Sequence, residues 1–413
     1  MFKPRTFEAK NKVAIAGVAH SKLGRKLERP LGALAVDACL AAIEDAGLTL
    51  QDIDGIATYP QTTGPGVGPE PGISSAPLEW MVKGLGIEEM RWWGNGGGNI
   101  STAIGYGISA IAAGLCNYVL VWRAMHQPRF GAFGSGTRNT FAEASSEPAP
   151  RAGGSAQFGA PYGAGDAPSG FAPAYMRYMK LHGAKREHMA AYAVTMRGNA
   201  NKNPNAIFYD QPMDYDDYMN CRMISDPLCL FDCDMPVDGA GAIVLARADL
   251  AKDLRHPPAY ITAMGSGGWD WRVRPPEEYR ITSSGNLGKT LWESTDMKPS
   301  DISGAMLYDG FSPDIYWWLE AFGFCGWGEA FEYIQDGRIA IGGELPINTF
   351  GGQVSEGRLH GIGHWLEAVK QVQHRADDEP GDGARNIPGA ENILVATGMT
   401  GHGTGVILST EPR

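Results

Sequence analysis

Residues 306–312, Met-Leu-Tyr-Asp-Gly-Phe-Ser, carry the pattern that decides the fold. The stretch begins as the apolar end of a strand, turns at Asp309-Gly310, and continues into the aromatic run Ile-Tyr-Trp-Trp-Leu at 315–319. A strand end that presents a tyrosine and an aspartate to a following helix is a common place for a catalytic group in a layered α/β protein. Tyr308 is therefore the first candidate for a functional side chain.

The same pattern occurs twice in the chain. Residues 50–59 (LQDIDGIATY) match residues 299–308 (PSDISGAMLY), and each copy follows a helix-like segment. Two later strands match as well, because 119–121 (VLV) corresponds to 393–395 (ILV). A strand–helix–strand order that occurs twice, with loops of different length, predicts two packed α/β halves related by a pseudo-twofold axis.

Length, charge and composition limit the possible functions. A chain of 413 residues can bury a large core, and its formal charge of −11 argues against nucleic acid or an anionic membrane surface as a main partner. The sequence contains no apolar run of about 18 residues, so we expect no membrane span. Residues 1–12 are charged, so we expect no secretory signal and a cytoplasmic protein. The cysteines lack the paired spacing of a zinc site, and we expect Cys39, Cys116, Cys229 and Cys233 to be reduced and buried.

The order of apolar runs predicts alternating strands and helices. We expect strands at 12–19, 53–59, 117–122, 235–246, 259–264, 302–308 and 392–396, and helices at 34–46, 78–85, 102–114, 187–198, 287–295 and 361–373. Residues 131–170 are rich in Gly, Ser, Ala and Pro, and an irregular stretch of this length in a compact protein usually lies over a functional site. We therefore divide the chain into an N-terminal half, 1–250, with a loop insertion at about 126–230, and a C-terminal half, 251–413.

This arrangement resembles the thiolase superfamily, and most closely the branch around sterol carrier protein X thiolase and its lipid-transfer-protein relatives. Five motifs carry the resemblance in the family's order: DGAGA at 238–242, YDGFS at 308–312, NTFGG at 348–352, LHG at 359–361 and GHGTGV at 401–406. The resemblance implies a thiolase fold of two pseudo-twofold-related mixed-sheet halves in five α-β-α-β-α layers, with an inserted loop region. It also implies a homodimer.

The positions that carry thiolase catalysis differ in this chain. A thiolase needs a cysteine thiolate at the N-terminus of a buried helix, where the helix dipole and backbone N–H groups favour it, but here that place falls in the three glycines at 96–98. The family's His-Asp-Cys-Phe block is similar to residues 308–311, in which both the histidine and the cysteine are replaced. The second catalytic cysteine would lie near Gly401. Thiolytic acyl transfer through an acyl-enzyme is therefore chemically unsupported.

The residues that this chain carries at those positions are similar to those of the thiolase-like acyl-CoA aldolases, which split the side chains of steroid CoA thioesters. A retro-aldol cleavage needs no nucleophile: it needs a base for the β-hydroxyl proton and donors that hold the thioester oxygen as an enolate forms. Tyr308 resembles the tyrosine of those aldolases, whereas Arg358 stands where they tend to carry a second tyrosine. The resemblance implies a CoA-thioester substrate without a further cofactor, and a small OB-fold/zinc-ribbon protein as partner.

The candidate catalytic residues are Tyr308, Asp309, Arg358, His360 and His402. We expect Tyr308 to be the base, with a pKa near 10 for a free tyrosine that the Arg358 guanidinium lowers. His360 or His402 would then handle the α-carbon proton. The expected substrate-binding residues are five helix-start and turn glycines, whose backbone N–H groups can cradle an oxyanion or phosphate, and one tryptophan. They are Gly96, Gly97, Gly98, Gly310, Gly401 and Trp93. Trp93 could line a pocket for a large apolar substrate, and it suits the protein interior or a dimer face equally well.

Two other functions stay open at this point. A non-standard thiolase would act on a β-ketoacyl-CoA with a nucleophile that the motifs do not identify. A non-catalytic acyl-CoA-binding subunit would have lost its activity together with the cysteine. A requirement for free CoA separates thiolysis from retro-aldol cleavage, and binding without turnover would indicate the subunit.

Overall fold

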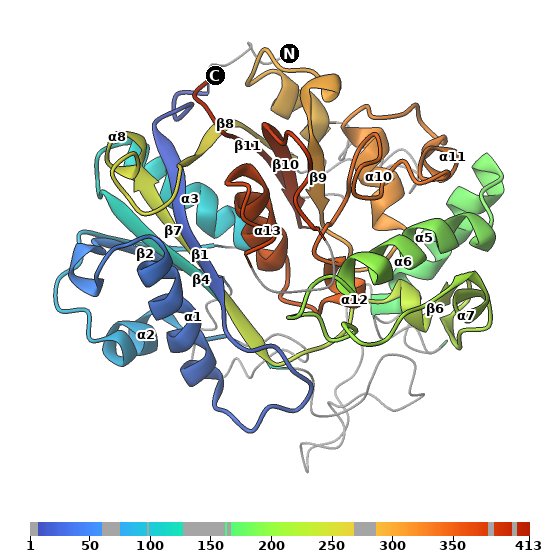
Figure 1. Ribbon diagram of the computed structural model, residues 1–413, viewed down its shortest axis with the longest axis horizontal. Coiled ribbons are helices and arrows are strands. Elements are labelled where there is room, and N and C mark those ends of the chain that lie inside the picture. The colour runs from blue at the N-terminus through green and yellow to red at the C-terminus, as the bar shows by residue number, and fades with distance from the viewer. Residues whose placement is uncertain are drawn as a thin grey trace.

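The computed structural model describes residues 7–59, 75–96, 99–126, 162, 167–267, 286–378, 384–398 and 403–413. Most of its strands form one nine-stranded mixed sheet with the order β3-β2-β4-β7-β1-β8-β11-β10-β9 (Figure 1). These strands are β1 (Val13–His20), β2 (Gly55–Thr58), β3 (Trp92–Asn95), β4 (Tyr118–Met125), β7 (Gly239–Arg247), β8 (Ala259–Ser266), β9 (Gly304–Leu307), β10 (Asn392–Thr397) and β11 (Thr404–Ser409). A separate two-stranded sheet joins β5 (Met223–Ser225) and β6 (Leu228–Cys229).

The large sheet repeats one pairing pattern in its two parts. β2 runs parallel to β4 with Gly55 opposite Val119, and β9 runs parallel to β10 with Gly304 opposite Ile393. β7 lies antiparallel to β4 and β1, as β11 lies antiparallel to β10 and β8. The two parts meet in a short antiparallel pairing of β1 with β8. The register therefore reproduces, residue for residue, the repeat that the sequence predicts.

Helices cover both outer faces of the sheet and fill the space between its two parts (Figure 1). α1 (Leu31–Asp45) and α2 (Leu78–Leu85) pack on the outside of the N-terminal strands, and α3 (Ile100–Ala112) and α13 (Ile362–Val372) lie in the centre. The C-terminal strands are covered by α5 (Ala167–His182), α6 (Arg186–Ala200), α10 (Asp314–Ala321) and α11 (Ala330–Tyr333). The buried apolar side chains form three clusters, one for each helix layer. The predicted mixed-sheet fold with α-β-α-β-α layers is confirmed. Other short helices are α7 (Tyr215–Met219), α8 (Ala248–Ala251) and α12 (Gly352–Ser355), and residues 286–292 are helical as well.

Local hydrogen bonds explain why the two copies fold alike. In the first copy Asp52 accepts a hydrogen bond from the backbone N–H of Thr49 at 2.7 Å, and in the second Asp301 accepts one from Lys298 at 2.8 Å. Each aspartate closes a short 3-10 turn, η1 (Leu50–Asp52) or η4 (Pro299–Asp301), directly before β2 or β9. A side-chain acceptor for an otherwise unpaired N–H is the usual way to start such a turn.

The structure departs from the predicted elements in several places. α5 begins at 167, inside the region 131–170 expected to be irregular, while residues 131–161 and 163–166 of that region lie outside the described residues. The strand expected at 235–246 starts at Gly239, and Asp238 before it forms an isolated antiparallel bridge with Gly24. α1 begins three residues early, at Leu31 directly after Pro30, and proline is well suited to a position beside the first helical turn.

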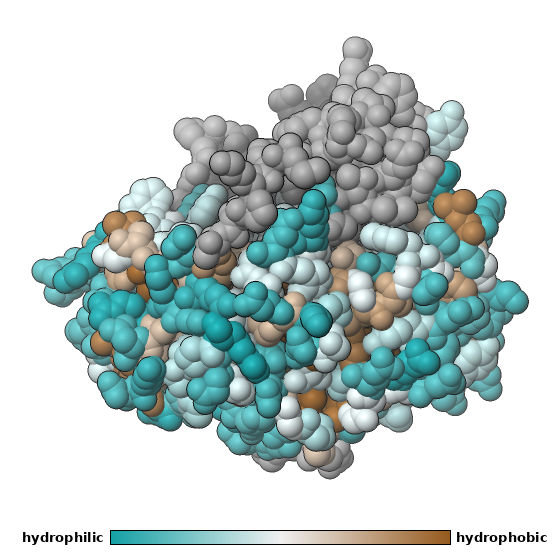
Figure 2. Space-filling view, turned by 90° about the horizontal axis from the view of Figure 1, so that it is seen from above, coloured by the Kyte–Doolittle hydropathy of each residue, from teal (hydrophilic) through white to brown (hydrophobic). Residues whose placement is uncertain are grey.

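The surface and the cysteines agree with the composition. No helix in the described part of the chain is long and apolar enough to cross a membrane. On the face shown in Figure 2 the described surface is mostly hydrophilic, with apolar residues in small separate patches. All six cysteines are free thiols, and Cys39, Cys116, Cys229 and Cys233 are buried as predicted.

Gly17 provides a test of the contact between β1 and α1. A Cβ atom at Gly17 would lie 2.4 Å from the Ala42 carbonyl oxygen and 2.5 Å from the Ala46 nitrogen. Because the helix backbone would have to move away, we predict that Gly17→Ala lowers the free energy of unfolding by about 2 kcal/mol in equilibrium urea denaturation. Gly198 in α6 has open space around it, so Gly198→Ala is the matched control and should raise that free energy by up to about 1 kcal/mol. Equal stability of the two variants would contradict the close packing.

Candidate active site

Asn348 holds the end of β9 in place. Its side chain accepts a hydrogen bond from the Leu307 N–H and donates one to the Leu307 carbonyl, both at 2.8 Å. The amide therefore takes the place of a neighbouring strand at this edge of the sheet. On the other side the Tyr308 N–H donates to the carbonyl of Ala396 at 2.8 Å. The chain consequently leaves β9 in a fixed direction, with Tyr308 as the first residue beyond it.

Asp309 is a fully buried carboxylate that joins four elements. Its Oδ2 accepts from the Tyr192 hydroxyl of α6 at 2.8 Å, and its Oδ1 accepts from the Gln353 N–H of α12 at 2.9 Å and from His364 Nε2 of α13 at 3.1 Å. Gly352 lies against the carboxylate so closely that a Cβ atom there would be 2.1 Å from Oδ2. With three donors on its oxygens, Asp309 is placed behind Tyr308 as a positioning residue.

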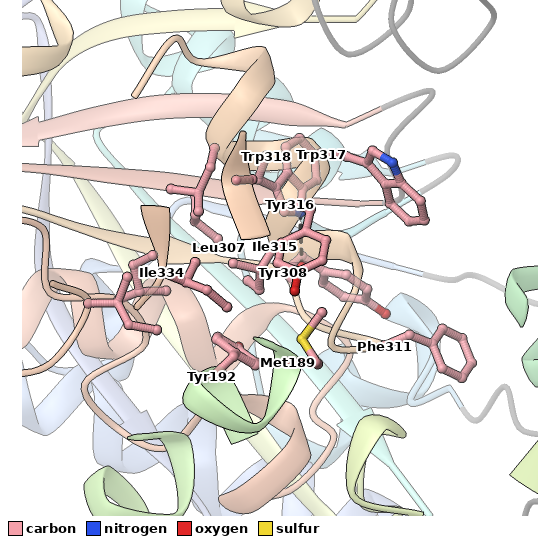
Figure 3. Close-up of a cluster of buried hydrophobic side chains, with 14 of the residues drawn as sticks. Met189, Tyr192, Leu307, Tyr308, Phe311, Ile315, Tyr316, Trp317, Trp318 and Ile334 are labelled. Atoms are coloured by element: carbon pink, nitrogen blue, oxygen red, sulfur yellow. Dashed lines mark hydrogen bonds between the residues drawn. The ribbon is translucent and has the colours of Figure 1, made fainter. Parts of the chain in front are cut away.

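The Tyr308 ring is packed between its own turn and α13. It stacks on the His364 ring with centroids 5.8 Å apart, and the side chain as a whole is 8% exposed. A Cβ atom at Gly310 would lie 2.9 Å from Tyr308 Cε1. Gly310 therefore makes room for the tyrosine ring. Figure 3 shows Tyr308 within the apolar cluster, with Phe311 and Trp317 at its edge.

A short segment before β7 connects the Tyr308 turn with Arg358. The N–H of Asp234 donates to the Gly310 carbonyl at 3.1 Å, and the N–H of Arg358 donates to the Met235 carbonyl at 2.7 Å. These backbone bonds bring two buried charges together, because Arg358 Nη1 lies 3.5 Å from Asp234 Oδ1. The sequence motifs do not show this ion pair.

The predicted lowering of the Tyr308 pKa is wrong. Burial raises the pKa of Tyr308 above its ordinary value, and the Asp234 carboxylate raises it further; the Arg358 guanidinium lowers it, but by less. Arg358 is paired with Asp234, so part of its charge is already compensated. Tyr308 is therefore a neutral phenol at neutral pH, which can donate a proton or pass one on but does not act as an ionised base.

His360 is a neutral hydrogen-bond donor. Arg123 in β4 is fully buried, and its Nη2 lies 3.2 Å from His360 Nδ1. A guanidinium can only donate, so Nδ1 accepts and Nε2 carries the proton. Burial, Arg123 and Arg358 lower the pKa of His360 well below its ordinary value. That His360 or His402 handles the α-carbon proton stays a prediction. An imidazole that is neutral can also stabilise charge by donating from Nε2.

Other predicted residues are placed separately or fall outside the structure. Gly96 lies against the first turns of α3, with the Ala103 nitrogen 2.7 Å from the position of a Cβ atom. Trp93 is 63% exposed on β3, which forms the opposite edge of the sheet from β9. Trp93 therefore does not line the Tyr308 site of this chain. Four of the expected residues lie outside the described residues: Gly97, Gly98, Gly401 and His402.

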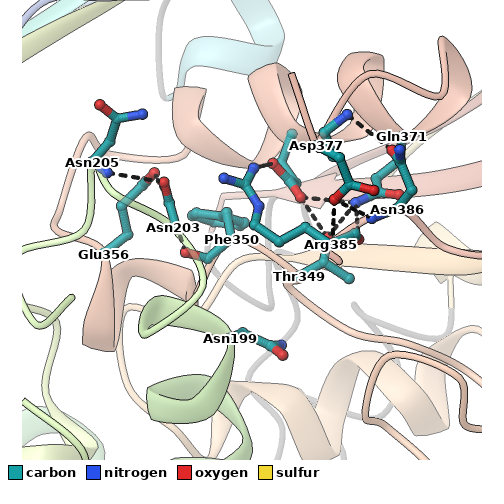
Figure 4. Close-up of polar contacts among 12 residues, drawn as sticks. Asn199, Asn203, Asn205, Thr349, Phe350, Glu356, Gln371, Asp377, Arg385 and Asn386 are labelled. Carbon is teal, nitrogen blue, oxygen red and sulfur yellow. Dashed lines mark hydrogen bonds and ion pairs between the residues drawn. The ribbon is translucent and has the colours of Figure 1, made fainter. Parts of the chain in front are cut away.

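A buried polar network supports α12 and α13 (Figure 4). Glu367 accepts from Thr349 Oγ1 at 2.6 Å and pairs with Arg385 Nη2 at 2.8 Å. Glu356 accepts from Asn203 Nδ2 at 2.9 Å, and burial raises the pKa of Glu356 to about 8. Buried polar groups with partners of this kind hold a single arrangement of the chain. The network thus fixes the turn that precedes Arg358.

Four side chains of the site were not predicted from the sequence. Arg123 had a usable signal, because it is the one charge in the apolar strand YVLVWRAM, and a buried charge is costly unless it serves a purpose. His364 contacts the Phe350 ring, as a packing residue of its helix would, but it also binds Asp309. Asp234 and Tyr192 had no pattern that could have identified them.

Comparisons with known proteins place the chain among enzymes of CoA chemistry. A family model described as Thiolase C-terminal domain-like matches residues 272–409. The chain is 33% identical over 407 residues to a steroid side-chain-cleaving aldolase of Thermomonospora curvata, covering 96% of this chain and 98% of that protein. It is 33% identical over 404 residues, with the same coverage, to the 17-hydroxy-3-oxo-4-pregnene-20-carboxyl-CoA lyase of Mycobacterium tuberculosis.

Solved structures agree with this placement. The Ltp2-ChsH2(DUF35) aldolase superposes with a TM-score of 0.80 at 32% sequence identity, covering 97% of this chain and 98% of the other. Human mitochondrial 3-ketoacyl-CoA thiolase in complex with CoA superposes with a TM-score of 0.64 at 14% identity, covering 98% of this chain and all of the other. The second likeness is one of fold alone.

Tyr192 tests the anchoring of Asp309. Its hydroxyl donates to Asp309 and accepts from Asn348 Nδ2 at 3.0 Å. We predict that Tyr192→Phe lowers the free energy of unfolding by about 1–3 kcal/mol in urea denaturation, because buried partners lose a hydrogen bond. Tyr260 is also buried but forms no side-chain hydrogen bond within the described residues, so Tyr260→Phe is the control and should change little. A loss as large in the control would show that the anchoring is not responsible.

Proposed function

The chain belongs to the thiolase superfamily, and we propose that within it this protein is an acyl-CoA aldolase. It would cleave a bulky, steroid-like β-hydroxyacyl-CoA by a retro-aldol reaction into a short acyl-CoA and a ketone or aldehyde. The observation that carries the proposal is the near full-length likeness to two enzymes named as a steroid side-chain-cleaving aldolase and an acyl-CoA lyase. The geometry around Tyr308 is consistent with it.

Three buried cysteines, Cys39, Cys116 and Cys233, offer no nucleophile to the Tyr308 site. Cys233 lies closest in the chain to Asp234, but it is 1% exposed and its Sγ donates to the Cys229 carbonyl at 3.5 Å. Burial raises the pKa of Cys39 and Cys116 above the ordinary value, so these thiols are protonated as well. A thiolate is the reactive form of cysteine. A cleavage that needs no covalent intermediate therefore fits the site better than thiolysis.

The retro-aldol reaction defines what the site must supply. The β-hydroxyl gives up its proton, the bond between the α-carbon and the β-carbon breaks, and the β-carbon becomes a carbonyl. The electron pair of the broken bond enters the thioester as an enolate, which is then protonated at the α-carbon. Nothing is oxidised or reduced, and the thioester itself accepts the electrons, so we propose that no cofactor is needed beyond the CoA of the substrate.

The described residues can supply the donors for this reaction. His360 would donate from Nε2 to the enolate oxygen, with the positive charge of Arg123 behind it. Burial lowers the pKa of Arg123 to about 9, which still leaves it charged at neutral pH. Oriented donors in a buried site stabilise a developing oxyanion more strongly than water does. Tyr308 would relay the β-hydroxyl proton, and His402 stays our candidate for protonation of the α-carbon.

The bulky part of the substrate would lie against the aromatic edge of the site. Phe171 of α5 and Phe311 pack against each other with their ring centroids 4.4 Å apart and their planes tilted by 33°. Phe311 and Trp317 lie at the edge of the cluster that contains Tyr308 (Figure 3). Flat apolar rings of this kind suit a fused-ring hydrocarbon such as a steroid.

We also propose an assembly for this enzyme. The chain would form a homodimer, as the thiolase resemblance implies, and would bind a small OB-fold/zinc-ribbon partner. Support for a second protein comes from the similar aldolase structure, whose name joins Ltp2 with ChsH2(DUF35). The activity test should therefore include co-expression with such a protein.

Cleavage without free CoA is the first prediction of the proposed function. We expect the protein to convert a steroid-like β-hydroxyacyl-CoA into a short acyl-CoA and a carbonyl product, followed by liquid chromatography, with no added CoA. Tyr308→Phe should lower kcat by at least about 100-fold, because it removes the proton relay. Cleavage only in the presence of free CoA would mean a thiolase. Substrate binding without turnover, with the partner present, would mean a non-catalytic subunit.

The donor role of His360 gives a second prediction. His360→Ala should lower kcat by about 10²–10³-fold, as does the removal of one oxyanion donor in other enzymes, with a smaller change in KM. A glutamine side chain has an N–H donor but cannot titrate, so His360→Gln should retain at least tenfold more activity than His360→Ala. Equal loss in the two variants would argue that His360 acts by proton transfer, and the donor role would have to be abandoned.

A further inference from the structure

Asp234 is a buried carboxylate with few partners. The residue is 6% exposed, and its Oδ1 accepts no hydrogen bond within the described part of the chain. That oxygen faces the Arg358 guanidinium, with Nη1 at 3.5 Å, which is an ion-pair distance and longer than a good hydrogen bond. Buried carboxylates are normally well provided with donors, because an ionised oxygen without them is costly. The small number of donors around the Asp234 carboxylate therefore needs an explanation.

The backbone fixes where this carboxylate lies. The N–H of Asp234 is bound to the Gly310 carbonyl, two residues beyond Tyr308. Pro236, two residues further on, pairs in parallel with Arg358. Asp234 is thus held between the turn that carries Tyr308 and the segment that carries the arginine, and the neighbouring residues cannot shift without breaking both contacts.

Arg358 lies 3.5 Å from Asp234, and the charged or titratable groups that interact electrostatically with Asp234 are Arg358, Asp309 and Tyr308. Burial raises the pKa of Asp234 to about 6, while Arg358 lowers that pKa and the Asp309 carboxylate raises it. The two carboxylates have different surroundings, since Asp309 accepts three hydrogen bonds and serves as an anchor. Asp234 Oδ1, in contrast, accepts no hydrogen bond within the described residues and has only the ion pair with Arg358. Two carboxyl groups placed in such unequal surroundings commonly divide structural and proton-transfer roles.

We propose that Asp234 is the proton acceptor of this site and acts through Tyr308. As the β-hydroxyl of the substrate passes its proton to the Tyr308 oxygen, the Tyr308 proton moves to Asp234, which becomes a neutral carboxylic acid. The Cα–Cβ bond breaks, and its electron pair enters the thioester; Asp234 loses the proton to water as the products leave. Arg358 holds the carboxylate in its ionised form between turnovers. This inference rests on the proposed function.

An ion pair kept for stability alone explains the arrangement less well. Moving two charges out of water costs more free energy than the attraction within a long, poorly hydrogen-bonded ion pair regains. A proton acceptor, in contrast, benefits from burial, because a pKa near the working pH favours reversible proton transfer. Acting through Tyr308 makes Asp234 a positioning residue of the site rather than one that touches the substrate, and its test must separate proton transfer from folding.

The test is the pH dependence of kcat/KM for CoA-independent cleavage by the wild-type protein and three variants. The wild type should lose activity tenfold per pH unit below about pH 6, because Asp234 must be ionised. Asp234→Asn should lower kcat by at least about 100-fold, remove this acid limb and leave KM within about threefold. Asp234→Glu should have a kcat at least tenfold higher than that of Asp234→Asn. Arg358→Gln should move the acid limb to higher pH, since the arginine favours the ionised carboxylate.

Asp232 supplies the matched control. It is fully buried in the same segment, but it accepts from the Tyr218 hydroxyl at 2.9 Å and from the Cys229 N–H at 2.9 Å. Asp232→Asn should keep the acid limb at the wild-type pH even if it melts earlier. The thermal midpoint of Asp234→Asn should stay at or above that of the wild type, which shows that the variant folds.

Two results would overturn the inference, and they are distinguishable. Wild-type kcat and an unchanged acid limb in Asp234→Asn, in a protein that cleaves without CoA, would exclude Asp234 while leaving the aldolase intact. Absence of CoA-independent cleavage by the wild type itself would overturn the proposed function and this inference with it.

Discussion

The buried carboxylate of Asp309 is the constraint on which the site depends. A fully buried charge is tolerated only when donors surround it, and here the donors come from Tyr192, Gln353 and His364 on three different helices. Satisfying one carboxylate therefore joins the end of β9 to α6, α12 and α13. The glycine at 352 follows from the same requirement, because any side chain there would collide with the carboxylate. The position of Tyr308 is a consequence of these contacts.

Burial rather than net charge decides the protonation of the site. Two arginines, Arg123 and Arg358, lie near Tyr308 and His360, yet the pKa of Tyr308 is raised and that of His360 is lowered. In both cases desolvation, the largest cause, favours the neutral form. The resulting site contains two neutral donors, Tyr308 and His360. Arg123 and Arg358 lie near them as cations, and Asp234 is the anion paired with Arg358. Such a site suits a reaction in which negative charge moves from a hydroxyl to a thioester oxygen.

The duplicated fold was predictable because its signals are local. The matched segments 50–59 and 299–308 each contain their own turn aspartate and their own apolar strand, so the pairing of Gly55 with Val119 recurs as that of Gly304 with Ile393. Tyr308 could be identified as a candidate for the same reason, from a strand end and a turn. The region expected to be irregular was less predictable, because α5 depends on packing against the C-terminal cluster rather than on a clear periodic pattern.

The sequence by itself determined the layered α/β fold, its internal repeat, the family resemblance and the loss of the thiolase cysteines. These properties depend on residue identity and order along the chain. Only the tertiary structure decided which charges meet: Asp234 with Arg358, Arg123 with His360, and Asp309 with its three donors. The physical reason is that a pKa depends on burial and on distances of a few Å between residues far apart in sequence, and neither quantity is written in the order of the amino acids.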